Sequence, residues 1–403
     1  MLEWDEDFKK LICFLKYQKE KPFLICDENT YKVCGDYISK ELEKQKREYD
    51  LLILPGNSSS DEKSICKVLL NTEENSLIVS IGSGSITDTA RFVAYKQKLR
   101  FVSVPTAPSM DGYASPVSAL TIDGLKTTVL AKPPEKIFVN FNIIKNSPDI
   151  LKKAGFGDLM GKYTALSDWM LSNILTGENI NLNVVNEMYD ACENTLKSIE
   201  KEDFEKLLLE GLVKSGKLMI VVGNSRPASG SEHHLAHYLE FLGYNLFHGI
   251  KVGISTLYII RLYKNLLKID LDDFRNNIAY SIEDWKKEIK NNFPNIYDKI
   301  IKENIERLKK MNDPSFRREM IKKIKENIKK IYSIVETLDK KEKEILEGYK
   351  KINFSITLED WGIKKEDLRR AIIYSLYIRD RFSILTLYQM LGILKEEAEK
   401  IIS

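Results

Sequence analysis

The chain has 403 residues, 43% of them hydrophobic and 30% charged, which is typical of a globular protein with room for two domains. Its 62 basic and 59 acidic residues leave a net charge of only +3, which argues against a nucleic-acid-binding protein. No apolar run is long enough to span a bilayer, and the five cysteines form no Cys-x-x-Cys pair. Because the first residues are acidic and lack an apolar segment, we expect no signal peptide. We therefore expect a cytoplasmic protein with free thiols, no membrane span and no nucleic-acid partner.

The first third of the chain alternates short apolar runs with helical patterns. The runs predict strands at 22–26, 51–54, 76–81 and 101–105, and the patterns between them predict helices at 5–20, 31–46, 61–72 and 89–96. This alternation is typical of a parallel α/β sheet. A hairpin with a turn at Asp123-Gly124 and a strand at 137–139 are expected to follow.

Two loops after these strands carry polar or glycine-rich sequence. Gly82-Ser83-Gly84 opens a helix, an arrangement that presents backbone N–H groups to a phosphate. The third glycine of the dinucleotide-binding motif is missing, so a plain tight turn is the alternative. The loop 105–116 holds three prolines, and Asp111 before Gly112 is also typical of an Asx turn.

The character of the sequence changes near residue 146. Beyond Ser147-Pro148 nearly all of the chain has helical periodicity, which predicts a domain boundary with an α/β domain at 1–146 and an all-α domain at 147–403. Lysines and glutamates alternate through the helical stretch 257–350, as on a solvated surface. Arg379-Asp380-Arg381 precedes an apolar run, and both an internal salt-bridge cluster and a cleft wall remain open interpretations.

All four histidines lie in one short stretch. His233 and His237 are four residues apart and share one face of a helix, and His248 opens a second glycine-flanked turn. A helical histidine pair with a third histidine downstream is part of a metal site that still lacks a carboxylate. Asp158 follows two glycines and is either that carboxylate or a helix N-cap. Surface or core histidines that bind no metal are the alternative.

Taken together, these segments resemble the glycerol-1-phosphate dehydrogenases. That family lies within the wider group of iron-containing alcohol dehydrogenases, glycerol dehydrogenases and dehydroquinate synthases. The resemblance spans about residues 20 to 265 and is carried by the turn at 82–88, Thr-Ala-Pro-Ser-x-Asp-Gly-x-Ala-Ser-Pro at 106–116, Gly157-Asp158, Ser-Gly-Ser-Glu-His at 229–233, and His248-Gly249. It implies a dehydroquinate synthase-like fold, with a Rossmann-like nucleotide-binding domain followed by an all-α metal-binding domain. The long C-terminal part is similar to the bacterial branch, whose dimeric enzymes can use nickel.

The resemblance also implies roles for individual residues. Asp158, His233 and His248 would bind the metal, with His234 as a possible substitute for His233. Asp111 and His237 would be catalytic, and these two together with Asp158 would contact the substrate. The implied cofactor contacts are Gly84, Ser85, Ile86, Thr87 and Asp88 at the pyrophosphate, Thr106, Ala107, Pro108, Ser109 and Ser115 at the nicotinamide, and Asp27 at the adenosine half.

The implied activity is the reduction of dihydroxyacetone phosphate to sn-glycerol 1-phosphate with NADH or NADPH, for glycerophospholipid synthesis. The resemblance implies one divalent ion per subunit, zinc first and nickel second, in a cytoplasmic homodimer that acts on a small phosphorylated substrate. The alternatives are a metal-dependent lyase of the dehydroquinate synthase type, a glycerol dehydrogenase, and a non-catalytic nucleotide-binding protein. Arg226 and Lys251 are the nearest cations in the sequence for the substrate phosphate.

Overall fold

The computed structural model describes residues 1–123, 125–269 and 280–402. The chain forms two compact units, and neither is continuous in sequence. The first comprises Met1–Leu159, Asn186–Ser225 and Phe247–Ile250, and the second comprises Met160–Val185, Arg226–Leu246 and Lys251–Ser403.

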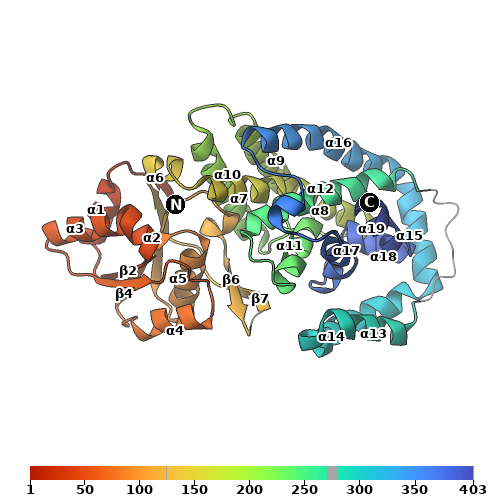
Figure 1. The fold of residues 1–403 in the computed structure, drawn as a ribbon, viewed down its shortest axis with the longest axis horizontal. Helices are drawn as coiled ribbons and strands as arrows, with labels where there is room; N and C mark the ends of the chain where they lie inside the picture. Colours follow the sequence, from red (N-terminus) through yellow and green to blue (C-terminus); the bar gives the residue numbers. More distant parts are fainter. Residues whose placement is uncertain (124, 270–279, 403) are drawn as a thin grey trace. The chain divides into compact units, whose positions relative to one another are not determined.

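A six-stranded parallel sheet forms the centre of the first unit (Figure 1). Its strand order is β1-β8-β5-β4-β2-β3, and the bounds are β1 (Leu2–Trp4), β2 (Lys21–Asp27), β3 (Asp50–Leu54), β4 (Ser76–Gly82), β5 (Arg100–Pro105) and β8 (Lys136–Val139). The central strands are buried on both faces, which explains why they read as continuous apolar runs.

Helices cover both faces of this sheet. On one face, α1 (Lys9–Lys16) and α3 (Asp36–Lys44) pack against side chains such as Leu24 and Val79. On the other, α4 (Glu62–Leu70) and α5 (Gly84–Lys96) pack against Phe23 and Ile78, and Figure 1 shows α3 and α4 on opposite sides of β2. Neighbouring residues of one strand thus enter different cores, as the two-residue period of a strand requires. Each fully buried side chain of this kind contributes about 1.5–3 kcal/mol.

The remaining elements of the first unit surround the loops at the carboxyl ends of the strands. They are α2 (Glu28–Thr30), the π-helical turn η1 (Tyr31–Gly35), the 3-10 turn η2 (Asp111–Ala114), the antiparallel hairpin β6 (Val117–Ile122) and β7 (Leu125–Leu130), α6 (Phe141–Lys145), α7 (Asp149–Met160), most of α9 (Leu182–Leu196), and α10 (Phe204–Val222). α10 packs closely on η2.

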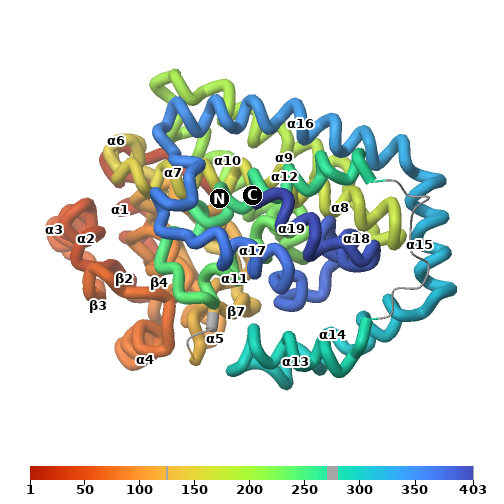
Figure 2. The backbone as a smooth tube through the Cα atoms, turned by 45° about the vertical axis from the view of Figure 1, so that its right-hand side comes forward, coloured from red at the N-terminus to blue at the C-terminus, as the bar shows by residue number. Residues whose placement is uncertain are grey.

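The described part of the second unit is helical. Its helices are α8 (Lys162–Thr176), α11 (Ser231–Phe241), most of α12 (His248–Leu266), α13 (Ile282–Asn292), α14 (Tyr297–Met311), α15 (Pro314–Glu326), α16 (Ile328–Lys351), α17 (Lys365–Tyr374), α18 (Ile384–Leu391) and α19 (Leu394–Ile402), with short turns η3 (Pro294–Ile296), η4 (Glu359–Trp361) and η5 (Ser375–Tyr377). The long helix α16 packs against α8, and α15 links it to α14 (Figure 2). Among the described residues, no helix has the length and apolar character needed to cross a membrane.

The predicted fold class, a parallel α/β sheet followed by a helical region, is confirmed. Two local predictions are wrong, because α5 begins at Gly84 rather than at Thr89 and His248 begins a helix instead of a turn. β1 was not predicted. Part of the predicted Asp123-Gly124 turn and residues 270–279 of the predicted 257–350 helical stretch lie outside the described residues. The boundary at 146 follows the change from mixed to helical structure and stays a prediction.

Candidate metal and cofactor site

The glycine-rich turn after β4 leads directly into α5. Ser83 is the N-cap, and Gly84, Ser85, Ile86 and Thr87 form the first turn of the helix. A Cβ atom on Gly84 would lie 2.7 Å from Sδ of Met110, so glycine lets the loop after β5 approach this turn closely. The turn therefore stands at the carboxyl edge of the sheet, the usual ligand-binding edge of a parallel α/β fold.

Asp88, in the second turn of α5, forms a buried ion pair with Arg91 at 3.1 Å. Burial raises the pKa of Asp88 to about 6, although the positive charge of Arg91 opposes the shift. Arg91 also donates to the carbonyl oxygens of Gly112 and Val117, the latter at 2.6 Å. α5 is thereby tied to the segment that carries Asp111 and Ser115.

The loop after β5 is held by its own polar groups. The hydroxyl of Tyr113 donates to the carbonyl oxygen of Ala107 at 2.5 Å and lies 3.0 Å from Oγ of Ser109. The backbone N–H of Thr106 donates to Gly82, and Oγ of Ser115 accepts from the N–H of Val117. The expected nicotinamide-side residues, including Pro108, thus form one ordered loop beside the first turn of α5.

Asp27 ends β2 and caps α2. Its Oδ1 atom accepts from the backbone N–H groups of Asn29 and Thr30 at 2.9 and 2.7 Å, while Oγ1 of Thr30 accepts from the N–H of Asp27 at 3.0 Å. This reciprocal capping box occupies Oδ1, and the adenosine contact stays a prediction.

Asp158 lies inside α7, so its interpretation as a helix N-cap is wrong. It is fully buried, and its Oδ2 atom accepts from the backbone N–H of Asp111 at 2.9 Å. The carboxylate of Asp111 accepts in turn from Oγ of Ser215 at 3.0 Å. α7 and α10 therefore orient the two acidic residues that were expected at the site.

Two glycines allow α7 to approach its neighbours. A Cβ atom on Gly155 would lie 1.7 Å from the carbonyl oxygen of Pro108, and one on Gly249 would lie 1.8 Å from the carbonyl oxygen of Ala154. Neither position can hold a larger residue without movement of the backbone. The close packing brings the start of α12, with His248, against the helix that carries Asp158.

α11 carries the other three histidines. Nδ1 of His233 lies 2.7 Å from the buried carboxylate of Glu232, which also accepts from the hydroxyl of Thr164. Because a carboxylate only accepts, Nδ1 of His233 carries the proton and Nε2 is left as the ligand atom. Nδ1 of His237 makes the equivalent contact with Glu240 at 3.1 Å.

His234 lies one residue further along α11 and is fully buried. Burial lowers the pKa of this ring well below its usual value, and the positive charges of Arg379 and Arg381 add to the effect. His234 is not part of either group of potential metal ligands among the described residues. His234 is therefore a less favoured candidate for a metal ligand than His233.

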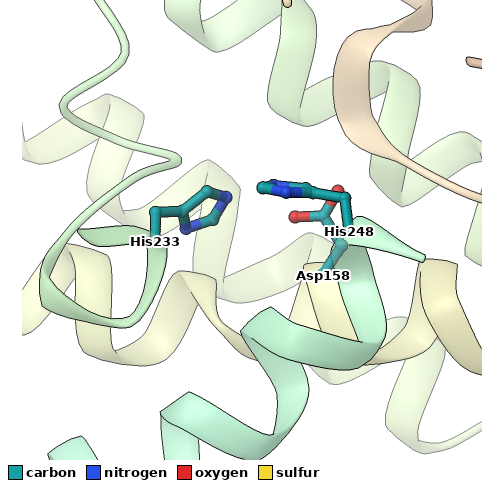
Figure 3. Close-up of side chains that lie close together, drawn as sticks. All are labelled: Asp158, His233 and His248. Carbon is teal, nitrogen blue, oxygen red and sulfur yellow. The ribbon is translucent and has the colours of Figure 1, made fainter. Parts of the chain in front are cut away.

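Asp158, His233 and His248 come together as a potential ligand set. One ligand atom from each lies within 4.8 Å of the others, and Figure 3 shows the three side chains pointing toward one another. Two imidazole nitrogens and one carboxylate oxygen are a donor set that suits a divalent transition ion and leaves a coordination position open. A second set, His237, Glu240 and His248, shares one member, but Glu240 also forms an ion pair with Lys251 at 3.2 Å.

The two cations suggested for a substrate phosphate have structural partners. Arg226 donates twice to Glu178, at 2.8 and 2.5 Å. Lys251 donates to the carbonyl oxygen of Leu246 at 2.6 Å in addition to its contact with Glu240. These contacts favour positioning roles for both side chains.

Sequence reasoning missed Glu232 and Ser215. The position of Glu232 beside a candidate ligand was an available signal, because metal-binding histidines usually donate their second ring N–H to a carboxylate or carbonyl. Ser215 had no local signal, since it contacts Asp111 from a helix more than a hundred positions away.

Comparison with known proteins places the chain among similar sequences. Residues 6–148 match the family model of iron-containing alcohol dehydrogenases. The chain is 35% identical over 267 residues to glycerol-1-phosphate dehydrogenase [NAD(P)+] of Bacillus subtilis, covering 62% of this chain and 68% of the relative. It is 36% identical over 260 residues to the enzyme of that name from Bacillus velezensis, covering 61% and 66%.

Among solved structures, sulfoacetaldehyde reductase from Bifidobacterium kashiwanohense in complex with NAD+ shares the fold, with a TM-score of 0.63 at 12% identity. That match covers 100% of this chain and 97% of the reductase. The sheet, the helical region and the similarity to curated relatives lead to one assignment: the chain belongs to the glycerol-1-phosphate dehydrogenase family, within the iron-containing alcohol dehydrogenases.

Proposed function

We propose that this protein reduces dihydroxyacetone phosphate to sn-glycerol 1-phosphate with NADH or NADPH and a divalent metal ion. The observation that carries the proposal is the convergence of Asp158, His233 and His248, whose ligand atoms lie within 4.8 Å of one another. Membership of the family supports the same activity, since the curated relatives are named glycerol-1-phosphate dehydrogenase [NAD(P)+].

A bound divalent ion would supply Lewis-acid polarisation of a substrate carbonyl, and a reduced nicotinamide would supply the hydride. The chain itself supplies orientation. The N–H of Asp111 fixes the carboxylate of Asp158, and Glu232 fixes the proton of His233 on Nδ1. Both ligands are therefore held in one orientation before an ion binds, which lowers the cost of binding it.

His237 and Asp111 are the proposed catalytic pair. The contact of Nδ1 with Glu240 orients the ring of His237, and Nε2 would hydrogen-bond a substrate hydroxyl or deliver a proton. Ser215 holds the carboxylate of Asp111 as an acceptor for a second hydroxyl. Asp158 is proposed to contact the substrate as well as the metal.

The proposed cofactor site combines the first turn of α5 with the loop after β5. Backbone N–H groups at the start of α5 favour a pyrophosphate near Gly84, Ser85, Ile86 and Thr87. Asp88 acts through Arg91, which holds the neighbouring loop. The nicotinamide would lie against Thr106, Ala107, Pro108, Ser109 and Ser115, with Asp27 toward the adenosine half.

Zinc is the first candidate for the ion and nickel the second, since imidazole and carboxylate ligands accept both. We also propose a cytoplasmic homodimer. The five cysteines are free thiols, with Cys26, Cys34 and Cys192 buried, which agrees with a reducing compartment. The lyase and glycerol dehydrogenase alternatives are not favoured, because the curated relatives carry neither name.

The test is a spectrophotometric assay of cofactor oxidation. Protein dialysed against a chelator would be given NADH or NADPH with dihydroxyacetone phosphate, without metal and with zinc or nickel. We expect oxidation only when metal is restored, and much slower oxidation with unphosphorylated dihydroxyacetone. Folded, metal-loaded protein that oxidises neither cofactor with the phosphorylated substrate would contradict the proposal.

A further inference from the structure

Two helices of the second unit begin side by side. Asp168, a fully buried residue of α8, accepts from the backbone N–H of Ser231 at 2.7 Å through Oδ2 and from that of Ile384 at 2.8 Å through Oδ1. The hydroxyl of Tyr263 donates to the same carboxylate at 2.7 Å. The first residues of α11 and α18 are thereby fixed next to each other.

Three arginines lie at this junction. Nη1 of Arg379 donates to Oγ of Ser229 at 3.2 Å, and Nη1 of Arg381 donates to the carbonyl oxygen of Ser229 at 3.0 Å. Arg226 donates to the carbonyl oxygen of Phe382 at 2.9 Å. The segment 379–383 is thus held against the segment that leads into α11, and guanidinium groups are concentrated where the two helices begin.

The junction holds charges of both signs, because Arg226 is paired with Glu178 and the buried carboxylates of Asp168 and Glu232 lie near the arginines. Burial, together with the positive charges of Arg379 and Arg226, lowers the pKa of Arg381 to about 9, while Glu178 and Glu232 oppose the shift. Arg379 and Arg381 are only partly buried, so part of each side chain remains accessible from solvent. Guanidinium groups gathered in this way favour an anion over any neutral ligand.

Three fully buried polar side chains belong to the two helix starts that the arginines join. Oγ of Ser231, Oγ of Ser383 and both ring nitrogens of His234 make no hydrogen bond to any described residue. The ring of His234 is close enough to Arg379 and Arg381 to interact with their charges. Buried polar atoms in folded proteins are nearly always hydrogen-bonded, so these groups indicate a polar ligand at the junction.

We propose that Arg379 and Arg381, together with Ser231, Ser383 and His234, form the subsite that binds the phosphate group of the substrate. Guanidinium forks match phosphate oxygens in pairs, and the hydroxyl and imidazole groups supply further hydrogen bonds. The backbone N–H of Ser231 is already satisfied by Asp168, so the side chains carry the binding. This inference rests on the proposed function for the identity of the substrate.

The position along α11 agrees with a triose phosphate. His233 and His237 follow Ser231 on the same helix, and one helical turn advances about 5.4 Å. Along the helix axis, a phosphate at the start of α11 therefore lies about half a turn from His233 and less than two turns from His237. Ser231 and His234 share one face of the helix, while His233 and His237 share another. Arg226 acts as a positioning residue, since it joins Glu178 to the carbonyl oxygen of Phe382.

A direct binding measurement tests the subsite without the reaction. Inorganic phosphate would be titrated calorimetrically into zinc-loaded protein: wild type, Arg379→Gln, Arg381→Gln and the control Arg261→Gln. Arg261 is an exposed arginine of α12 that lies over the ring of Tyr258. We expect each junction variant to bind phosphate at least tenfold more weakly, about 1.4 kcal/mol, and the control to match wild type.

Kinetics distinguish a phosphate contact from a purely structural role. Arg379→Gln should raise KM for dihydroxyacetone phosphate at least tenfold and should change the slow reduction of unphosphorylated dihydroxyacetone by a much smaller factor. If Arg379→Gln fails to fold, Arg379→Lys is the substitute, because lysine keeps the positive charge but lacks the paired N–H donors of the guanidinium group. Arg379→Lys should lose less phosphate affinity than Arg381→Gln. Equal loss of activity with both substrates would indicate a structural role and overturn the inference.

The two proposals can fail separately. Wild type that binds phosphate but reduces no dihydroxyacetone phosphate, with binding lost in Arg379→Gln, would reject the proposed function and leave the anion subsite supported. Wild type that reduces the substrate, while both junction variants keep phosphate affinity and KM, would reject the subsite alone. Wild type that binds no phosphate at millimolar concentration would also reject the subsite.

Discussion

Two histidines on one face of α11 have different proposed roles. His233→Ala should remove a metal ligand and lower metal affinity by more than about 100-fold, the upper end of what loss of a second-shell partner costs. His237→Ala should keep the metal and lose roughly 10²–10⁴-fold in turnover, the usual contribution of general acid–base catalysis. Metal analysis of both variants after dialysis, with activity measured in parallel, checks this division. Equal metal loss in the two would contradict it.

The carboxyl group of Asp88 predicts a pH dependence of stability. Its pKa is raised to about 6 by burial, against about 3.9 for an unfolded chain. The folded state therefore holds an extra proton between these values, so this contribution to stability is present below about pH 4 and is lost as the pH rises through 6.

We expect wild type to lose up to about 3 kcal/mol of unfolding free energy relative to Asp88→Asn between pH 4 and pH 7. Denaturant unfolding of both proteins at several pH values measures the difference. The prediction would be contradicted if the difference in unfolding free energy between the two proteins stayed constant with pH, or if wild type gained stability relative to Asp88→Asn as the pH rose. Either result would show that burial does not destabilise the ionised form of Asp88.

At the scale of elements, the approach of α7 to the loop after β5 depends on Gly155. Because a Cβ atom there would lie 1.7 Å from a backbone oxygen of Pro108, Gly155→Ala must displace α7 or the loop. We expect a loss of about 1–3 kcal/mol in unfolding free energy. Metal binding should also weaken, since Asp158 lies on the next turn of the same helix.

Gly177→Ala is the matched control. Gly177 has φ of +77° and a Cβ atom there would meet nothing within 4 Å, so the change costs only backbone strain, about 1 kcal/mol, and should leave metal affinity unchanged. Denaturant unfolding and metal titration of both variants provide the comparison. If the two variants keep equal metal affinity, the packing of α7 does not position Asp158.

The buried strands could be predicted from the sequence, whereas the conformation of the glycine-containing segments could not. The buried strands β2, β4 and β5 were predictable because a strand covered on both faces is a continuous apolar run. His248 was expected in a turn and Asp158 was open to a helix-cap interpretation, because glycine beside them is a turn signal. In the structure Gly155 and Gly249 serve close packing between backbones instead, which a single sequence does not reveal.

Other features depend on contacts between distant residues. β1 is a three-residue edge strand that pairs with β8, more than a hundred positions later, so the local sequence carries no signal for it. The sequence left two interpretations of the Arg379-Asp380-Arg381 motif open. Its proposed role depends on contacts of the two arginines with Ser229 and on the helix junction fixed by Asp168. The candidate ligand residues could be named from the resemblance, whereas the groups that orient them could not.

At the scale of the whole molecule, Asp168 holds four helices of the second unit together. Asp168→Ala would leave the N–H groups of Ser231 and Ile384 and the hydroxyl of Tyr263 buried without their acceptor. At about 1–3 kcal/mol for each, we expect a loss of at least 3 kcal/mol in unfolding free energy. Thermal or denaturant unfolding checks the value.

Asp313 provides the comparison for this prediction. It caps α15 from an exposed position by accepting from the N–H of Ser315, so Asp313→Ala should cost only about 0.5–2 kcal/mol. If Asp168→Ala is no more damaging than the exposed cap, the carboxylate is not a central support of the helical unit.

The interleaving of the two units has a consequence for biosynthesis. The last stretch of the first unit is Phe247–Ile250, although its sheet is complete once β8 has been made. A nascent chain that has not yet reached the start of α12 holds Asp158 and His233 but lacks His248. Most of the sheet therefore leaves the ribosome before the proposed ligand set exists, and a metal ion would bind at that proposed site only after α12 has emerged.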